Sequence, residues 1–157
     1  MKNQRKKFAI TTLIACLLLF TTVSFTGCST EFAKKEYDSD IAIAGSDRNV
    51  MIGAVHNNIN DEYSLTASKF YGRTTCIKKS LSTEKTVNVR ISLSITEGKA
   101  KVVYIDADKN VVTLIECTPD SSTNTPFIQE LTMTKGQNIF KIVGYDCKDL
   151  KLILQIM

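Results

Sequence analysis

The feature that most constrains the fold is a ten-residue stretch, 87–96, in which apolar and polar residues alternate. Its apolar side chains occupy every second position: Val87, Val89, Ile91, Leu93 and Ile95. Successive side chains of a strand point to opposite faces, so this stretch predicts a strand with one buried and one exposed face. Helical geometry would scatter the same five side chains around the helix axis. The chain therefore contains at least one strand of a sheet that is covered on one side.

Further strand-like stretches recur along the chain, separated by residues that favour turns, although 64–70 and 72–78 alternate more weakly and 101–105 and 111–117 have apolar residues on both faces. The expected strands are 64–70, 72–78, 87–96, 101–105, 111–117, 127–134, 139–144 and 150–156. Turns at Gly98 and at 106–110 arrange three of these strands in a predicted meander. No segment after residue 28 shows convincing helical periodicity. The pattern predicts an all-β fold, an antiparallel β-sandwich of jelly-roll or Ig-like type with seven to eight strands. We expect its core to contain Val89, Ile91, Leu93, Leu131, Ile142 and Leu152.

The first 28 residues form a different kind of segment. Four basic residues, Lys2, Arg5, Lys6 and Lys7, precede an uncharged and mainly apolar stretch, 8–25. A charged start followed by a short apolar block is typical of a secretory signal peptide. A retained membrane anchor is the alternative, but 18 residues that include several Thr are close to the lower limit for crossing ~30 Å of hydrocarbon. An ordinary secreted protein is a further alternative.

The end of this segment, Thr26-Gly27-Cys28, resembles the lipobox of bacterial lipoproteins, in which small residues precede a diacylated cysteine. Phe25 departs from the aliphatic residue that the family usually has there. The resemblance implies that 1–27 is a lipoprotein signal peptide and that Cys28 is the lipidation site and the mature N-terminus. Two acyl chains give stable attachment to a bilayer. We therefore expect an extracytoplasmic domain anchored by lipid to the bacterial cell membrane, or to the outer membrane in a Gram-negative source.

The composition after cleavage limits the possible partners. Removing the four basic residues of the signal peptide from the 20 Lys+Arg leaves 16, against 16 Asp+Glu, so the remaining chain has no net charge. Nucleic-acid binding needs an excess of basic residues, so we expect no nucleic-acid partner. The only histidine is His56, and no pair of cysteines has metal-binding spacing, so no metal and no cofactor are expected. Cys76, Cys117 and Cys147 remain either as buried free thiols or as one disulfide and one thiol.

The 130 residues from Cys28 onward are enough for one domain. The segment 28–49 is rich in charge and poor in large apolar residues, which predicts a flexible tether between the lipid and the domain. The β-sandwich domain is then expected at 50–157. Its first apolar stretch, 50–55, is either a strand or a short helix, and a loop containing His56 is expected after it.

Few residues suggest chemistry. Asp106, Asp108 and Asn110 have the spacing of the start of a calcium-binding loop, but Val111 and Cys117 stand where that loop needs Gly and Glu, so a turn is expected. Ser121-Ser122-Thr123 reads as part of an exposed loop, because no base accompanies it. Glu116 and Glu130 are expected on exposed strand surfaces. The chain is therefore not expected to be an enzyme.

A binding function is expected instead. The segment 131–144 resembles the late strands of galactose-binding-like jelly-roll domains, although no tryptophan is present to serve as a sugar platform, so no ligand residue is carried over. Tyr71 and Tyr145, each next to a glycine, are the candidate ligand-binding residues. The long loop 118–126 is a second candidate surface. We expect a non-enzymatic module that binds a surface glycan or protein; the alternative is a structural lipoprotein of the cell envelope that acts through a protein partner or the wall.

Overall fold

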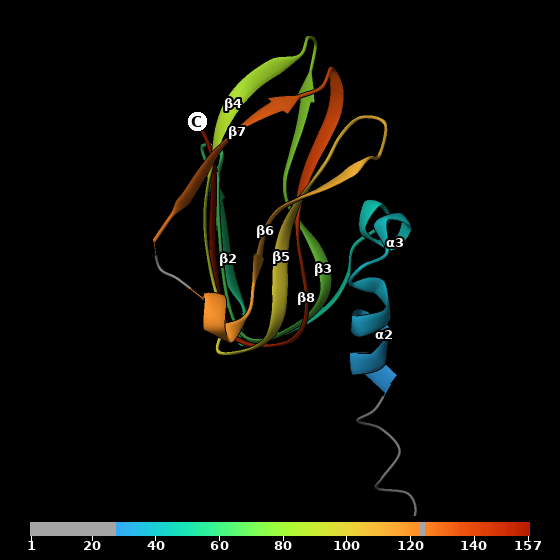
Figure 1. Cartoon of the computed structure of the whole chain (residues 1–157), viewed down its shortest axis with the longest axis vertical. Helices are drawn as coiled ribbons and strands as arrows, with labels where there is room; N and C mark the ends of the chain where they lie inside the picture. Colours follow the sequence, from blue (N-terminus) through green and yellow to red (C-terminus); the bar gives the residue numbers. More distant parts are fainter. Residues whose placement is uncertain (1–27, 123–124) are drawn as a thin grey trace, which may run out of the picture.

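The computed structural model describes residues 28–122 and 125–157. Within these ranges the chain forms eight strands, all paired antiparallel: β1 Arg48–Ile52, β2 Val55–Ile59, β3 Glu62–Leu81, β4 Lys85–Ser94, β5 Glu97–Ile105, β6 Val111–Cys117, β7 Phe127–Met133 and β8 Gly136–Ile156. The strands form a β-sandwich around one main core (Figure 1). The all-β, antiparallel prediction is confirmed. The predicted signal peptide, 1–27, lies outside the described residues.

The two layers belong to one sheet that folds over on itself. The long strands β3 and β8 run through both layers. The first layer contains β2, the first half of β3, the second half of β8, β4 and β7. The second layer contains β1, the second half of β3, the first half of β8, β5 and β6.

Glycines mark the line where the sheet bends. Gly72 of β3 pairs with Gly144 of β8, and Ala100 of β5 pairs with Gly144 from the other side. Gly72 has φ +96°, and a Cβ there would lie 2.0 Å from the carbonyl oxygen of Arg48. Gly98 has φ +82°, and a Cβ there would lie 2.4 Å from the backbone of Asp146. The fold-over therefore needs residues without a side chain at these positions.

These bends correct two predictions. The predicted strands 64–70 and 72–78 are one strand, β3, and 139–144 and 150–156 are one strand, β8. The predicted meander is wrong because β4 and β5 do not pair with each other. Both pair with the same edge of β8. The β4 ladder ends at Ser94↔Lys151 and the β5 ladder begins at Glu97↔Lys148, so the chain continues in one direction from the first layer into the second. Gly98 bends the chain there; it does not reverse it.

The predicted core is confirmed in most positions. Val89, Ile91, Leu93, Ile142 and Leu152 are buried, and Leu131 is half-buried. The alternation of 87–96 corresponds to β4, whose inward residues pack between the layers. The loop expected around His56 is wrong: this residue lies in β2, an exposed strand that pairs with β3.

The segment 28–47 is helical and packed, which corrects the prediction of a flexible tether and of no helix. It contains α2, Cys28–Glu36, and α3, Asp40–Ala44, and it lies on the outer face of the second layer (Figure 1). Tyr37 and Ile43 are buried there against Val103, Ile105 and Val143. The few apolar residues of this segment fall on the side that faces the sheet, which its overall composition did not reveal. We call residues 28–47 the N-terminal strap.

Candidate functional site

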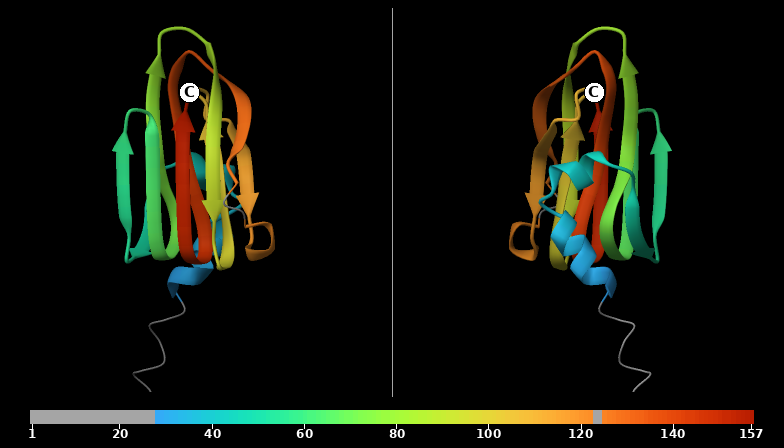
Figure 2. Two further views of the ribbon diagram at one scale, coloured as in Figure 1. Left: turned by 90° about the vertical axis from the view of Figure 1, so that its left-hand side faces the viewer. Right: turned by 90° about the vertical axis from the view of Figure 1, so that its right-hand side faces the viewer.

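The two outer faces of the sandwich differ. The N-terminal strap lies over the strands of the second layer, whereas neither of its helices, α2 and α3, lies over the strands of the first layer (Figure 2). We call the outward side chains of the first layer around β3 the open face. They are Val55, Asn57, Ile59, Glu62, Ser64, Thr66, Ser68, Arg90, Ser92, Ser94, Lys151, Ile153 and Gln155.

Strand pairing arranges these side chains in rows across the sheet. Asn57 pairs with Ser64, and Ser64 pairs with Ile153. Two residues earlier on β3, Glu62 lies between Ile59 of β2 and Gln155 of β8. Residues at paired positions on one face of a sheet are close enough to contact one ligand together. Side chains from segments almost 100 residues apart therefore form one surface.

The open face has two shallow hollows that adjoin along β3. The first has a volume of about 310 Å³ and is lined by Asn57, Ile59, Asn60, Glu62, Ser64 and Gln155. The second has a volume of about 170 Å³ and is lined by Gly53, Thr66, Ala67, Ser68, Asp149, Leu150 and Lys151. Ser64 lines the first hollow and Thr66 the second, and both point to the same side of β3. From Glu62 to Ser68 the strand extends about 20 Å, so the hollows together form an elongated depression.

The chemistry of the depression is polar and close to neutral. Amide groups come from Asn57, Asn60 and Gln155, and hydroxyl groups come from serine and threonine side chains of β3. Amides and hydroxyls both donate and accept hydrogen bonds. The charged groups are of both signs, with Glu62 at one end and with Asp149 and Lys151 at the other. Such a surface suits an extended ligand that is rich in hydroxyl or amide groups and carries no strong charge.

The hairpin between β2 and β3 fixes one end of this depression. Asn60 and Asp61 both have positive φ, 49° and 66°, as a two-residue turn of type I′ requires. The carboxylate of Asp61 accepts a hydrogen bond from the ammonium of Lys79 at 2.6 Å. Asn60 is therefore held at the end of the first hollow by the turn geometry and by this ion pair.

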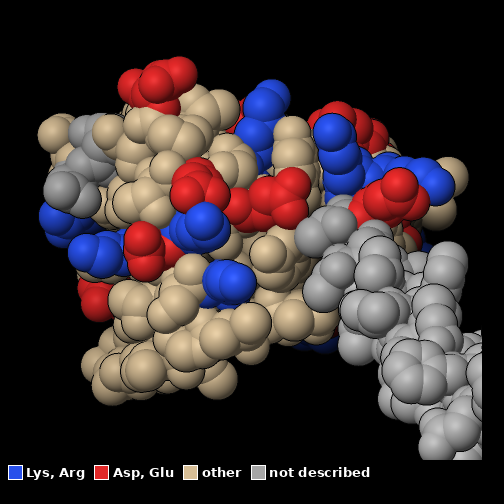
Figure 3. Space-filling view, turned by 90° about the horizontal axis from the view of Figure 1, so that it is seen from below, with Lys and Arg blue, Asp and Glu red and all other residues tan. Residues whose placement is uncertain are grey.

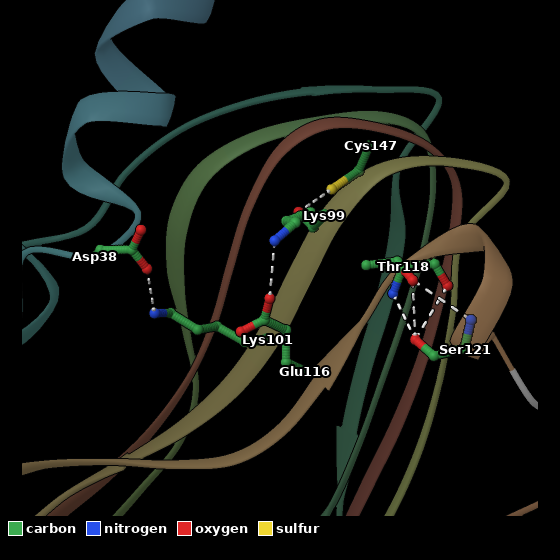
Figure 4. A network of polar contacts seen from close by, with 7 residues as sticks. All are labelled: Asp38, Lys99, Lys101, Glu116, Thr118, Ser121 and Cys147. Atoms are coloured by element: carbon green, nitrogen blue, oxygen red, sulfur yellow. Dashed lines mark hydrogen bonds and ion pairs between the residues drawn. The ribbon is translucent and has the colours of Figure 1, made fainter.

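The covered face has the opposite character, because basic side chains are buried in it. The side chains of Arg73, Lys101 and Lys141 point from the second layer towards the N-terminal strap and are only 3–9% exposed. Acidic residues of the strap neutralise them. Glu36 pairs with Arg73, Asp38 pairs with Lys101 at 3.2 Å, and Asp47 pairs with Lys141 at 3.0 Å. Figure 4 shows the Asp38–Lys101 pair between the helical segment and β5.

Asp47 has the most complete set of partners. Its carboxylate accepts hydrogen bonds from the backbone N–H of Thr75 at 2.9 Å and from the Thr75 hydroxyl at 3.0 Å, in addition to the Lys141 ion pair. Burial acts to raise the pKa of Asp47, but the hydrogen bonds from Thr75 and Lys141 together outweigh it and hold the pKa below its ordinary value. Lys141 also donates to the carbonyl oxygen of Gly45 at 2.5 Å. The end of the strap is thus fixed to β3 and β8.

The two tyrosines expected to bind a ligand lie near the bend of the sheet, and Tyr145 contacts the strap. Tyr71 precedes Gly72 on β3 and Tyr145 follows Gly144 on β8, so the structure places both next to this glycine pair. The Tyr145 ring packs edge-on against Tyr37, with 5.0 Å between ring centres. Tyr71 and Tyr145 are both half-buried. Tyr145 helps to hold the strap, and neither residue belongs to the open face.

The other candidate residues have structural partners. The Asp106 carboxylate accepts hydrogen bonds from the backbone N–H groups of Asp108 and Asn110 at 2.9 and 2.8 Å, which confirms the turn. The Ser121 hydroxyl accepts from the backbone N–H of Thr118 at 2.8 Å in a reciprocal cap (Figure 4). Glu116 pairs with Lys99 at 3.3 Å. In the described ranges, no three His, Cys, Asp or Glu residues are placed to hold a metal ion.

The three cysteines Cys76, Cys117 and Cys147 are free and buried. Burial raises the pKa of all three thiols, that of Cys147 to about 12. A thiol with a raised pKa is a poor nucleophile, so these residues act as small apolar groups of the core. The lipidation predicted at Cys28 is untested: α2 begins at this residue, and its side chain is outside the described part of the molecule.

The surface near α2 has no area dominated by one sign of charge. Viewed from that end of the sandwich, basic and acidic side chains are interspersed (Figure 3). Among the described residues, no helix has both the length and the hydropathy needed to cross a bilayer.

Comparisons with known proteins give only distant similarities. No protein-family model and no curated protein matches this chain. It is similar to the solved structure of CBM35 from Paenibacillus barcinonensis, with 14% identity, a TM-score of 0.39 and coverage of 72% of this chain and 98% of that one. It is also similar to a variant of a family 29 carbohydrate-binding module complexed with mannohexaose, with 11% identity, a TM-score of 0.41 and coverage of 70% and 78%.

A third similar structure is the N-terminal cellulose-binding domain of β-1,4-glucanase C from Cellulomonas fimi. Here the identity is 12%, the TM-score is 0.37, and the match covers 71% of this chain and 88% of that one. Similarities of this size do not assign the chain to a family. No ligand and no residue role is transferred from these structures.

Proposed function

We propose that this protein is a non-enzymatic binding module, anchored by lipid at Cys28 outside the cytoplasm, that holds an uncharged glycan along the open face. The observation that carries the proposal is the elongated depression along β3, lined by amide and hydroxyl groups and open along about 20 Å. Sugar hydroxyls pair well with such groups, because each can donate and accept a hydrogen bond.

Several properties favour a glycan over a protein on this face. Protein interfaces concentrate aromatic and arginine anchors at their centre, and neither an aromatic residue nor an arginine lines the two hollows. A polar, elongated depression matches an extended polysaccharide better than it matches a compact protein surface. Because no aromatic ring is available for stacking, binding rests on hydrogen bonds, and we expect a modest affinity for each sugar and a preference for polymers.

Calorimetric titration with neutral and anionic polysaccharides tests the proposal. We expect binding to a neutral polysaccharide, weakened about three- to tenfold by Asn57→Ala and by Gln155→Ala, because each removes a hydrogen-bonding group worth ~1 kcal/mol. Asn88→Ala is the matched control: Asn88 lies on β4, outside both hollows, and the affinity should not change. Binding that is equally strong in all three variants, or binding of anionic polysaccharides alone, would contradict the proposal.

The anchor is tested separately. The intact mass of protein extracted from membranes should correspond to a chain that begins at a diacylated Cys28. Cys28→Ala should prevent both diacylation and processing, since the thioether forms at this sulfur, so the extracted protein should keep residues 1–27 and lack the added lipid mass. A Cys28→Ala protein that is processed and anchored like the parent would refute the anchor without affecting the proposed glycan site.

The second candidate function is that of a structural lipoprotein of the cell envelope that acts through a protein partner. A specific observation favours it: the exposed strand edge at residues 49–59 of β1 and β2 is long and uncharged.

A further inference from the structure

β1 and β2 form one continuous edge of the sandwich. β1 pairs with β3 from Arg48↔Arg73 to Ile52↔Lys69, and β2 pairs with β3 from Val55↔Thr66 to Ile59↔Glu62. The two ladders keep the same register on either side of Gly53, where the backbone bends with φ +60°, so residues 48–59 follow β3 over about 40 Å. In the described part of the chain, β1 and β2 pair only with β3. Their other side therefore presents a row of backbone donors and acceptors.

This edge has few of the features that normally prevent pairing with another chain. Residues 49–59 contain no charged side chain and no proline. Four apolar side chains of the edge are well exposed: Val50, Ile52, Val55 and Ile59, with exposed fractions of 47–70%. Natural sheets usually protect an edge with lysine, proline, a bulge or a covering segment. A long edge without such protection is suited to accept a further strand.

The other two edges of the sandwich differ in this respect. Among the strands that the structure describes, β6 pairs only with β5 and contains Glu116, and β7 pairs only with β4 and contains Glu130. Each of these strands has seven residues. A charge within a short edge strand opposes the close approach of another chain. The exposed, uncharged edge is thus specific to residues 49–59 of β1 and β2.

A second copy of this chain is an unsuitable occupant. An antiparallel pair of identical strands is related by a two-fold axis perpendicular to them, so the copies point in opposite directions. The strands run along the long axis of the molecule and α2 begins at one end of it (Figure 1). Self-pairing would therefore place the two copies of Cys28 at opposite ends of the dimer, which conflicts with anchoring in one membrane. Parallel self-pairing avoids this conflict but gives a less stable ladder.

We propose that the β1–β2 edge binds an extended, uncharged segment of a partner protein by β-strand addition. Main-chain hydrogen bonds to the free side of 49–59 supply the affinity, and alternate side chains supply the specificity. The partner segment carries apolar residues where it meets Val55 and Ile59, and hydroxyl or amide residues where it meets Asn57. A charged partner residue is disfavoured, because the edge offers no opposite charge along this length. Only the exclusion of a second copy rests on the proposed anchor at Cys28.

The test uses the full-length processed protein in detergent and a peptide probe. The probe is a labelled ten-residue peptide of alternating Thr and Val, acetylated and amidated so that it carries no charge. We expect the peptide to bind, as followed by fluorescence anisotropy, and to slow the hydrogen exchange of backbone amides in 49–59. Val55→Lys should weaken binding about tenfold or more, because it places an unpaired charge at the centre of the new ladder.

Ile128→Lys is the matched control on the opposite edge. Ile128 of β7 is 56% exposed, so the same chemical change is made at an edge strand that is not proposed to bind. Its affinity for the peptide should equal that of the parent. Three results would overturn the proposal: no slowing of exchange in 49–59 at saturating peptide, equal losses in both variants, or a dimer of the parent that Val55→Lys dissolves.

Discussion

The two outer faces of the sandwich differ in the chemistry of their outward side chains and in what covers them. On the second layer, apolar side chains and three basic groups point outward, and the N-terminal strap covers them with Ile43, Tyr37 and three carboxylates. On the first layer, the outward side chains are mostly small and polar, and nothing described covers them. The same sheet therefore has one face that needs a cover for stability and one that is free to bind. The covered face is distinguished from the open face by its outward apolar side chains and its buried charges, more than by the order of its strands.

The largest difference in stability is expected between two isoleucine-to-alanine substitutions, one made on each face. Ile43 of the strap is completely buried, whereas Ile153 of the open face is 46% exposed. Ile43→Ala should reduce the free energy of unfolding by about 2–5 kcal/mol, because it leaves a cavity. Ile153→Ala should change it by less than about 0.5 kcal/mol. Urea denaturation measures both, and similar losses in the two variants would show that the strap is not packed as described.

A smaller effect should follow from uncoupling one ion pair of the covered face. Asp47→Asn removes the charge that faces the ammonium of Lys141, which is only 3% exposed. We expect a loss of about 1–3 kcal/mol, since Asp47 itself is partly solvated. Glu97→Gln is the control: it breaks the Lys148–Glu97 pair, whose side chains are 47% and 59% exposed, and should have no measurable effect on stability. Equal effects of the two changes would remove the distinction between buried and exposed pairs.

A gain in stability of about 1 kcal/mol is expected from Tyr37→Phe. The Tyr37 hydroxyl is buried and has no hydrogen-bond partner among the described residues, and an unpaired buried polar group destabilises the folded state. The ring contact with Tyr145 is kept in the variant. A rise in the melting temperature would agree with this account. A clear loss of stability would mean that the hydroxyl has a partner and that the covered face is more polar than described.

The smallest effect concerns acid stability. The pKa of Asp47 is held below its ordinary value, so its contribution to stability is fully present above the unfolded-state pKa of about 4 and is lost as the pH falls through the folded-state pKa. Stability of the parent should therefore decrease below about pH 4 more steeply than that of Asp47→Asn. Denaturation midpoints between pH 2 and 6 measure the difference. Parallel pH profiles would contradict the assigned role of this carboxylate.

The strands and the core could be predicted from sequence because the signal is local. Alternation in 87–96 identifies β4 and its buried face, and the same holds for the last part of β8, where Leu150, Leu152 and Leu154 are buried. The sequence shows where the pattern is interrupted by glycine, but not whether the chain reverses or bends there. Gly98 breaks the pattern as a turn would, yet it bends the sheet between its layers because β8 pairs with the strands on both sides of it.

The covered and open faces could not be predicted in the same way. The strap has a low density of apolar residues, and its carboxylates resemble those of a solvated segment until their partners on β3, β5 and β8 are known. The open face depends on register: Asn57, Ser64 and Gln155 are ordinary outward residues in the sequence, and only strand pairing brings them together. No local pattern identifies such a surface.

The central claim, that the open face is the binding surface, is tested most directly by mapping backbone amide chemical shifts during titration with a neutral polysaccharide. The account predicts shifts confined to 57–68 and 149–155, with those of the strap and of 118–122 unchanged. Shifts confined to 118–122, or around Tyr71 and Tyr145, would contradict it and place the binding surface elsewhere on the sandwich.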